Sequence, residues 1–595
     1  MTVSELDRFA PRFASGVDGL LRDFNLAGVL SAADVHVATR VAALAQESDP
    51  SVLLAAALAV RAPRLGHVHV DLARIRETAA VEGEEGSDEL LALPWPDPVE
   101  WLSHVAASPL VGVDRPMHLE GSWLYLDRYW REERQLAADL LEMSTGAGSG
   151  GVSLAGGDPD QRRAVAGALA HRFSVIAGGP GTGKTTTVAR IVAELLSGAA
   201  AQDRRAPLIA LAAPTGKAAA RLEQAVHEAA AELAVSDEVR AQMLSLGGST
   251  IHRLLGRRPD SNSRFRHSRR QRLPHDVVIV DETSMVSLSL MARLVEAVRP
   301  GARLVLVGDP GQLASIEAGA VLGDIVGPAA SSPTPPPGPL AGHIVVLERG
   351  HRFGGAIAAL AEAVRRGDAD AALALLGAGD PAIRWLDSED SDREVRTAAD
   401  RAAGRVLESA REGAAADALA ALGAFRLLCA HRHGPHGVST WNARVESWLA
   451  ATADGFDAAD RWYPGRPLLV TENDYELGLY NGDTGVIVRR PDGGVAAAFE
   501  RRGEIVYYSP TRLQSFETVH AMTIHKSQGS QFATAAVLLP GPDSRLLSRE
   551  LLYTALTRAR EALIVVGSEE AVATAIERPI ARASGLRGRL WPPDW

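Results

Sequence analysis

A glycine-rich loop near residue 180 constrains the fold more than any other part of the chain, because of what stands on either side of it. Residues Gly178 to Thr185 match the pattern G-x-x-x-x-G-K-[ST]. The run FSVIAG before them is apolar and strand-like, and TTTVARIVAELL after them has helical spacing. Glycines in such a loop let backbone N–H groups face an anion, and the helix N-terminus adds partial positive charge. The segment therefore predicts a strand–loop–helix unit that binds phosphate groups.

Individual residues of this loop have expected roles. Lys184 would reach the β- and γ-phosphates of a nucleotide, and the Thr185 hydroxyl would hold Mg²⁺. The residues predicted to contact the nucleotide are Gly178, Gly179, Pro180, Gly181, Thr182, Gly183, Lys184, Thr185 and Thr186.

Lysine is almost confined to motif-like strings. The chain has 62 lysines and arginines, and only Lys184, Lys217 and Lys526 are lysines. They stand in GGPGTGKTTT, APTGKAAAR and TIHKSQGSQF. No acidic residue stands two positions before any of them, so the PD-(D/E)-x-K nuclease pattern is absent from the sequence. The chain is therefore predicted to have no nuclease centre of that kind.

Composition sets further bounds. A chain of 595 residues is expected to form several domains. There is no apolar run near 18 residues, and the N-terminus is polar, so we expect a cytoplasmic protein without a membrane span or secretory signal. The single cysteine, Cys429, excludes an internal disulfide and a cysteine-based metal site. A net charge of −11 means that any nucleic-acid surface must be local.

The pattern along the chain predicts an α/β protein with three regions. Residues 1–150 carry short helical runs, and the Gly/Ser-rich stretch STGAGSGG follows them. In residues 151–340, strand-like runs alternate with helical ones, which is typical of a parallel sheet. Residues 341–595 repeat this alternation around an insert at about 460–515, where NGD and DGG turns indicate a small β-barrel.

Further catalytic candidates follow the phosphate loop. Asp281 ends the apolar run VVIVDE, where a second Mg²⁺ contact belongs, and Glu282 could orient or deprotonate an attacking water. Hydrolysis also needs charge stabilisation at the γ-phosphate. The candidates for this role are Gln312, Arg352 and Arg558, although an arginine taken alone is more often a solvated surface residue.

Taken in order, several strings resemble one known family. They are GGPGTGKTTT, APTGKAA, TIHRLLG, DETSM, GDPGQLASI, YNGDTGV, AMTIHKSQGSQF and YTALTRAR. Together they resemble superfamily 1 DNA helicases of the RecD group, the α subunit of exodeoxyribonuclease V. The resemblance implies two RecA-like domains that clamp ATP and Mg²⁺, and a small SH3-like β-barrel in the second. It also implies that Gln161 contacts the adenine and that Arg352 and Arg558 come from the second domain.

The same resemblance implies a single-stranded DNA track across both domains, with movement from 5′ to 3′. The implied DNA contacts are Pro214, Thr215, Lys217, Thr250, His252, Asn473, Thr523, His525 and Lys526, with Asp474 nearby. The residues themselves add a basic insert at 256–274, with seven arginines and one acid. Arginines there would bind phosphates in a salt-dependent way, although a solvated surface loop would have the same composition.

Partners also follow from the resemblance. The chain would join RecB-like and RecC-like subunits in a heterotrimer that processes duplex DNA ends for recombinational repair, with residues 1–150 docking on a partner. Three alternatives remain at this point, namely a stand-alone RecD-like helicase, a phosphate-loop ATPase switch without unwinding activity, and a protein that binds ATP structurally without hydrolysing it. His431, His433 and His436 are crowded, but no acidic or cysteine cluster accompanies them, which favours a loop over a metal site.

Overall fold

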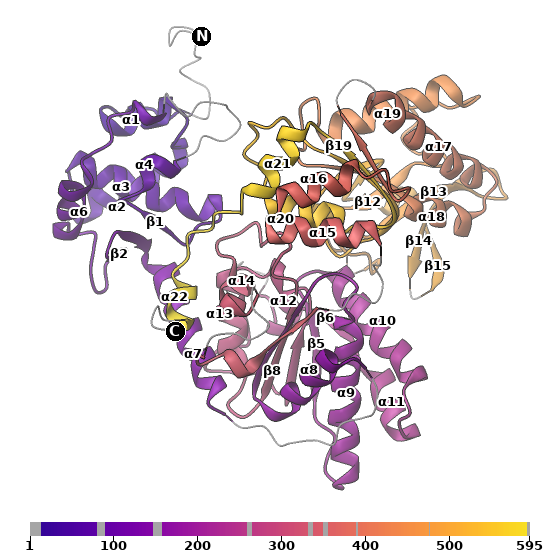
Figure 1. The fold of residues 1–595 in the computed structure, drawn as a ribbon, viewed down its shortest axis with the longest axis horizontal. Coiled ribbons are helices and arrows are strands. Elements are labelled where there is room, and N and C mark those ends of the chain that lie inside the picture. Colours follow the sequence, from indigo (N-terminus) through magenta and orange to yellow (C-terminus); the bar gives the residue numbers. More distant parts are fainter. Residues whose placement is uncertain are drawn as a thin grey trace.

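The computed structural model describes residues 13–79, 90–146, 157–258, 264–330, 337–348, 355–387, 391–474, 476–501 and 503–591. Figure 1 shows a mostly helical N-terminal region, a first α/β domain below it in magenta, and a second α/β domain in orange and yellow. Parallel sheets form the centres of both domains, and an antiparallel sheet is inserted in the second. The predicted fold class is confirmed.

The first domain is built on a parallel sheet with the order β6-β5-β7-β8-β4-β9. Four of these strands are buried along their whole length, as expected for runs of Val, Ile, Leu and Ala covered by helices on both faces. The strands are β4 (Phe173–Gly178), β5 (Ile209–Ala213), β6 (Gly248–Thr250), β7 (Val277–Val280), β8 (Arg303–Gly308) and β9 (Ile344–Leu347).

Helices cover both faces of this sheet. One face packs on the apolar sides of α8, α9 and α10, and the other packs on α13 and α14. The helices are α8 (Pro159–Ala170), α9 (Lys184–Ala201), α10 (Gly216–Glu232), α11 (Asp237–Ser245), α12 (Ile251–Leu255), α13 (Leu288–Ala297) and α14 (Val321–Val326). Short 3₁₀ turns follow at η3 (Thr283–Met285), η4 (Gly327–Ala330) and η5 (Ala341–His343).

The second domain has a parallel sheet with the order β10-β19-β18-β11-β17. Its strands are β10 (Ile383–Leu386), β11 (Phe425–Cys429), β17 (Ala521–Thr523), β18 (Phe532–Leu538) and β19 (Ala559–Val566). Its helices are α15 (Ala356–Arg366), α16 (Ala369–Gly377), α17 (Ser391–Arg411), α18 (Ala415–Ala424), α19 (Val438–Thr452), α20 (Arg549–Leu556) and α21 (Glu569–Glu577), with η7 (His525–Ser527).

The insert lies between α19 and β17 in the chain and is an antiparallel sheet with the order β15-β14-β13-β12-β16. Its strands are β12 (Pro467–Val470), β13 (Thr484–Arg489), β14 (Val495–Arg501), β15 (Glu504–Tyr508) and β16 (Phe516–Thr518), with η6 (Pro510–Arg512) before the last. Figure 1 shows this sheet at the edge of the second domain that faces α10.

The N-terminal region packs short helices around a small antiparallel sheet with the order β1-β3-β2. Its helices are α1 (Leu20–Leu26), α2 (Ala32–Ala45), α3 (Pro50–Arg61), η2 (Ala62–Leu65), α4 (Ile75–Thr78) and α6 (Pro98–Ala107). Its strands are β1 (His69–Asp71), β2 (Met117–Glu120) and β3 (Trp123–Leu126).

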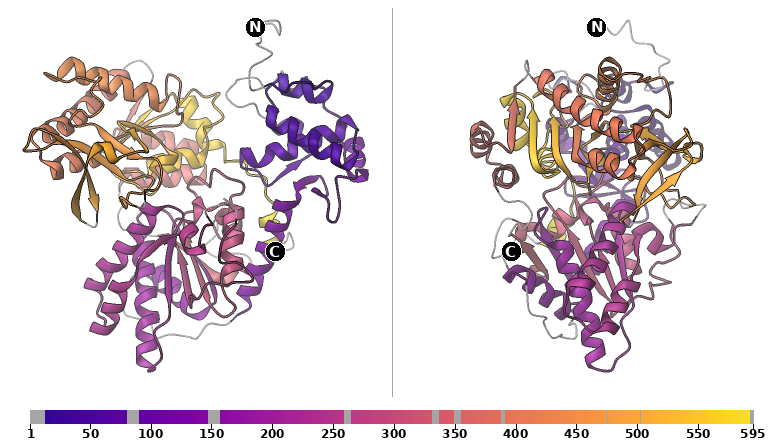
Figure 2. Two further views of the ribbon diagram at one scale, coloured as in Figure 1. Left: turned by 180° about the vertical axis from the view of Figure 1, so that it is seen from behind. Right: turned by 90° about the vertical axis from the view of Figure 1, so that its right-hand side faces the viewer.

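Two helices join the first domain's core from the ends of the chain. α7 (Asp127–Ser144) buries Leu136 and Leu140 there, and α22 (Leu586–Leu590) adds Leu586 from the C-terminus. The Trp591 indole N–H donates to the Ile325 carbonyl at 3.1 Å. The C-terminal segment, yellow in Figures 1 and 2, therefore leaves the second domain and returns to the first.

Candidate functional site

The phosphate loop joins β4 to α9, and its lysine lies against its own backbone. Gly181 and Gly183 have φ values of 79° and 81°, a left-handed conformation that glycine adopts without strain. The Lys184 ammonium donates to the carbonyls of Gly178 and Gly179 at 2.7 and 2.8 Å. The Thr182 hydroxyl also donates to the Gly179 carbonyl, at 2.9 Å. The loop is thus closed around the lysine that sequence reasoning singled out.

Two acidic residues follow β7, the strand next to β8 in the sheet. Asp281 is buried, and burial together with the neighbouring Glu282 charge raises the pKa of its carboxyl above the usual range. The Lys184 charge opposes this rise, which places the ammonium near that carboxylate. Glu282 has a φ of 52°, an uncommon value for a residue other than glycine. Such strain clusters at functional sites, where the surrounding structure holds it in place.

Asp309, at the end of β8, is a third acid of this site, and sequence reasoning missed it. It is buried, which raises the pKa of its carboxyl, while the Lys184 charge lowers it. The Gln312 amide donates to it at 3.0 Å and the Tyr553 hydroxyl donates at 3.2 Å. Its position at the carboxyl end of a strand beside the phosphate loop is the signal that could have identified it.

The loop that carries Gln312 is hydrogen-bonded to the second domain through both backbone groups of Leu313. The Leu313 N–H donates to the Thr554 hydroxyl at 2.9 Å, and the Leu313 carbonyl accepts from the Gln528 amide at 2.9 Å. Tyr553 also approaches the phosphate loop, since a Cβ on Gly179 would lie 2.9 Å from its hydroxyl oxygen. Within the described residues, the buried Gln312 carbonyl oxygen has no hydrogen-bond partner.

Arg558 is buried in the second domain, and its pKa is affected by the acids of the first. Burial lowers the pKa of its guanidinium, while the charges of Glu282 and Asp309 raise it. The guanidinium donates to the carbonyls of Thr554 and Ser530 at 2.9 and 3.1 Å. Arg352, the other arginine predicted for this site, lies outside the described residues.

Gln161 lies beside the phosphate loop on the first turn of α8. Its side-chain amide approaches the Thr182 carbonyl at 3.4 Å, and its backbone N–H donates to Asp158, the N-cap of the helix, at 2.9 Å. Thr185 and Thr186 begin α9 just after Lys184, and Pro180 lies inside the loop.

The donor set of the cleft fits ATP with Mg²⁺. Mg²⁺ takes oxygen ligands, and the Thr185 hydroxyl and Asp281 carboxylate are such ligands. The glycine backbone leaves the loop open to phosphate oxygens, and Lys184 supplies the counter-charge beside them. A Cβ on Gly178 would lie 2.7 Å from the Thr182 hydroxyl oxygen, so a larger residue there would distort the loop.

A cleft of about 640 Å³ lies between the first domain and the insert. Five residues predicted to contact DNA line it, namely Pro214, Thr215, Thr250, His252 and Asn473. Thr215 and Thr250 are the N-caps of α10 and α12, and each hydroxyl accepts from a backbone N–H of its own helix. Burial and the Arg257 charge lower the pKa of His252, which favours its neutral form.

The predicted contacts from the second domain lie on and beside η7, and they are not among the residues that line this cleft. The Lys526 ammonium forms an ion pair with Glu517 at 2.6 Å. The Thr523 hydroxyl accepts from the Lys526 N–H at 3.2 Å. Burial lowers the pKa of His525, and the nearby arginines, Arg582 first, lower it further.

Lys217 is bonded between three parts of the protein. Its ammonium donates to the Ser530 hydroxyl of the second domain at 2.8 Å and to the Gly482 carbonyl of the insert at 3.2 Å. Burial lowers its pKa to about 8. Arg221, one turn further along α10, donates to the Gly529 carbonyl. In this conformation Lys217 therefore connects the first domain to the second domain and to the insert.

The basic insert at 256–274 is described in part, since residues 259–263 lie outside the described residues. Arg257 and Phe265 pair as an antiparallel bridge, and the Phe265 ring lies 5.8 Å from that of His252. Arg269 donates to both carboxylate oxygens of Asp139 on α7, at 2.7 and 2.5 Å. Some of these arginines therefore hold protein elements together.

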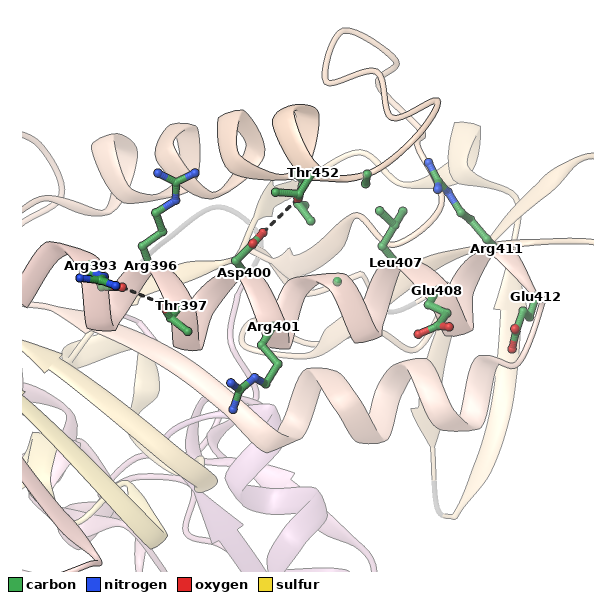
Figure 3. Close-up of a pocket in the computed structure, with 13 residues that line it drawn as sticks. Arg393, Arg396, Thr397, Asp400, Arg401, Leu407, Glu408, Arg411, Glu412 and Thr452 are labelled. Atoms are coloured by element: carbon green, nitrogen blue, oxygen red, sulfur yellow. Dashed lines mark hydrogen bonds between the residues drawn. The ribbon is translucent and has the colours of Figure 1, made fainter.

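A second groove, of about 810 Å³, lies between α17 and α19, on the outer side of the second domain. Figure 3 shows that side chains of both charges line it, and Asp400 accepts a hydrogen bond from Thr452. Its mixed charges, with Glu408 and Glu412 beside Arg411, do not form the uniformly basic surface expected of a phosphate site.

No helix in the part of the chain that the structure describes is long and apolar enough to cross a membrane. The described residues also contain no group of three or more His, Cys, Asp or Glu side chains that could hold a metal ion. His431 lies within 3.3 Å of the Ser544 hydroxyl, while His433 and His436 are exposed.

Comparisons with known proteins match successive parts of the chain. The family "RecBCD enzyme subunit RecD, N-terminal domain" matches residues 26–125. An "AAA domain" family matches residues 161–318, and a "UvrD-like helicase C-terminal domain" family matches residues 518–566.

Individual relatives match over most of this chain. RecBCD enzyme subunit RecD of Mycolicibacterium smegmatis is 52% identical over 95% of this chain and 98% of its own length. The protein of the same name from Mycobacterium tuberculosis is 52% identical over 97% and 98%. The ATP-dependent RecD2 DNA helicase of Deinococcus radiodurans is 32% identical over 81% of this chain and 60% of its own length. The chain therefore belongs to the RecD family.

Proposed function

We propose that the chain is an ATP-dependent helicase that moves 5′ to 3′ along single-stranded DNA. It acts as the RecD-type subunit of a helicase–nuclease that processes duplex DNA ends at double-strand breaks, in the cytoplasm. The observation that carries this proposal is a split nucleotide site. Lys184, Asp281 and Asp309 come from the first domain, and Tyr553 bonds to Asp309 from the second.

Each residue of the cleft has a definite part in the proposed hydrolysis. Lys184 holds the β- and γ-phosphates, and Thr185 and Asp281 would hold Mg²⁺, which draws charge from the phosphate oxygens. Glu282 orients and deprotonates the attacking water. The Gln312 amide carbonyl oxygen has no hydrogen-bond partner among the described residues, which suits it to accept a hydrogen bond from that water.

The second domain completes the site. Arg558 lies close enough to Glu282 and Asp309 for their charges to raise the pKa of its guanidinium. In the closed cleft we expect the Arg558 guanidinium to exchange its backbone partners for γ-phosphate oxygens. Arg352 is proposed to contact the same phosphate. Because each half lacks groups that the other holds, hydrolysis requires closure. Closure in turn shifts the DNA contacts of one domain relative to those of the other, and alternating grip then produces movement.

DNA binding is supported by the cleft between the first domain and the insert. Pro214, Thr215, Thr250 and His252 of the first domain face Asn473 of the insert across one cleft. Thr523, His525 and Lys526 are proposed to grip the strand from the second domain. Pro214 and Thr215 follow β5, which pairs with β7 of the nucleotide site, and Gln528, just after η7, donates to the Leu313 carbonyl. DNA bound to both sets would therefore sense cleft closure.

The partners are proposed to be RecB-like and RecC-like subunits, with the N-terminal region docking on the latter. The relatives named as RecBCD subunits are 52% identical to this chain, whereas the Deinococcus RecD2 helicase is 32% identical, which favours this over a stand-alone helicase. The chain has no PD-(D/E)-x-K lysine, so the proposed complex would cut DNA with a partner's nuclease.

The test is co-purification with the partner subunits, followed by unwinding assays on duplexes with 5′ or 3′ single-stranded tails. A partner helicase could mask this chain, so the complex is compared with one that carries Lys184→Gln. We expect the variant to lose the activity that depends on a 5′ tail. Equal loss on both tails would contradict the polarity. An ATPase rate that single-stranded DNA does not raise would favour the ATPase switch.

A further inference from the structure

A short segment at the C-terminus connects both α/β domains. The Ile580 N–H donates to the Glu550 carboxylate of α20, in the second domain, at 2.7 Å. The Gly585 N–H donates to the Glu133 carboxylate of α7, which packs on the first domain, at 2.8 Å. We call residues 581–584, between these two anchors, the strap. A residue spans at most about 3.3–3.6 Å, so the strap limits how far the two anchors can separate while both bonds are kept.

The strap also contacts the N-terminal region. The Val68 N–H donates to the Ala583 carbonyl at 2.7 Å, and the Ala583 N–H donates to the His67 ring at 3.0 Å. Burial, with the Arg582 and Arg61 charges, lowers the pKa of His67 to about 4, so its ring is neutral and can accept this bond. The strap therefore joins three parts of the protein.

Arg582 is the residue of the strap that contacts the loop carrying Gln312. Its guanidinium donates to the Leu65 carbonyl of the N-terminal region at 3.3 Å and to the Ser315 carbonyl at 3.1 Å. Ser315 follows Gln312 and Leu313 on the loop between the two domains. Burial lowers the pKa of the Arg582 guanidinium, and its described hydrogen bonds go to these neutral carbonyls.

The N-terminal region is shaped to fit this guanidinium. Gly66 has a φ of 83°, which favours glycine, and a Cβ there would displace the Arg582 guanidinium from its present position. The Gly66 carbonyl accepts from the Gly319 N–H, at the far end of the same loop, at 3.0 Å. The loop from Gln312 to Gly319 is thus held by the second domain, the strap and the N-terminal region together.

We propose that Arg582 is a positioning residue that couples the N-terminal region to the nucleotide cleft. The strap is anchored on both α/β domains, so cleft closure must move it or strain its bonds to Leu65 and Val68. A partner that docks on the N-terminal region would, through Arg582, bias the loop that carries Gln312. This inference rests on the proposed ATPase and helicase function.

The test uses the full chain in complex with its partner subunits and compares three variants. Arg582→Met keeps most of the side-chain bulk and removes the donors, Arg582→Lys keeps charge and donors, and Arg587→Ala is a control on an exposed arginine of α22. The measurements are kcat and KM for ATP with single-stranded DNA, and the ATP hydrolysed per base pair unwound.

Coupling energies between sites correspond to about 5- to 150-fold, and we expect the low end for one arginine. Arg582→Met should lower DNA-stimulated kcat about 5- to 10-fold and raise the ATP used per base pair, with KM for ATP within about 2-fold. Arg582→Lys should recover most of the coupling, and Arg587→Ala should match the parent.

Two outcomes would overturn the inference while leaving the proposed function intact. One is that Arg582→Met matches the active parent in kcat and in ATP used per base pair. The other is that its rates with and without DNA fall equally together with its thermal unfolding midpoint, and that lysine does not rescue them, which indicates a structural role alone. A parent complex without DNA-stimulated ATPase would instead contradict the proposed function.

Discussion

The two sides of the interdomain junction are built differently. On the nucleotide side, Asp281, Asp309 and Arg558 are buried and hydrogen-bonded. Burial raises the pKa of the two carboxyls and lowers that of the guanidinium, which favours the neutral form of each group. On the DNA side, Pro214, Thr215 and His252 are half-buried and line an open cleft. Three predicted contacts on this side differ. Thr250 and Thr523 are buried, and the Lys217 ammonium is bonded between parts of the protein.

This difference has a physical reason. Charge stabilisation in a site that excludes water is strong, and it depends on donors that are already in place. Binding a flexible strand requires many weak, adaptable contacts whose effects are spread along it. Single changes on the nucleotide side should therefore have large effects on turnover, and single changes on the DNA side should have small ones.

The largest effect should come from Arg558→Ala. An arginine at the γ-phosphate contributes about 10³- to 10⁵-fold to turnover, so kcat should fall by at least about 10³-fold while nucleotide affinity changes little. Single-turnover hydrolysis and equilibrium nucleotide binding would measure the two quantities. Arg560→Ala, on an exposed arginine of β19, is the matched control. A loss smaller than ten-fold would show that Arg558 has only the structural bonds seen here.

Glu282→Gln should have the next largest effect. General base catalysis contributes about 10²- to 10⁴-fold, so turnover should nearly stop while ATP binding persists, because the amide keeps the shape of the carboxylate. Steady-state ATPase and nucleotide-binding assays would test this, with Glu232→Gln on the exposed end of α10 as the control. Unchanged turnover would mean that the chain binds ATP without hydrolysing it at this residue.

On the DNA side, His252→Ala should have a moderate effect. Its ring lines the cleft and is neutral near pH 7, so it would contribute by stacking, which is worth about 1–3 kcal/mol per base. Single-stranded DNA affinity should fall about 5- to 150-fold, with DNA-independent ATPase unchanged. Affinity titrations with labelled oligonucleotides would measure this, and His436→Ala, at an exposed position, should match the parent. A DNA-independent ATPase loss equal to the affinity loss would break the proposed separation of the two sides.

At Lys217 we expect a pH-dependent effect on stability rather than on turnover. Its pKa is lowered from 10.5 to about 8, so between these values the unfolded chain holds the proton while the folded chain releases it. The free energy of unfolding should therefore rise with pH across this window, by at most about 3 kcal/mol. Lys217→Met should lose this rise, which unfolding midpoints of parent and variant at pH 7, 9 and 10 would detect. Parallel pH profiles for the two proteins would contradict the lowered pKa.

The fold class could be predicted because its signals are local. The alternation of buried strand runs such as FSVIAG and VVIVDE with helical segments predicts parallel sheets, and both sheets are present. Sequence reasoning missed two residues of the site. Asp309 had a local signal, its place just after β8, whereas Tyr553 had none. Their roles depend on a contact between residues 244 positions apart, at 3.2 Å. The assigned chemical roles of Gln161, Lys184 and Glu282 stay predictions.

Sequence by itself determined the phosphate loop, the acidic pair after β7 and the position of three lysines in motif-like strings, because each follows from neighbouring residues. Tertiary structure alone decided that Lys217 connects three parts of the protein, that α7 and α22 complete the first domain's core, and that Arg582 reaches the loop carrying Gln312. Local propensities act over a few residues. These contacts instead form only when distant segments fold against one another, because the free energy gained by burying apolar surface outweighs the entropy lost in closing the long loops between them.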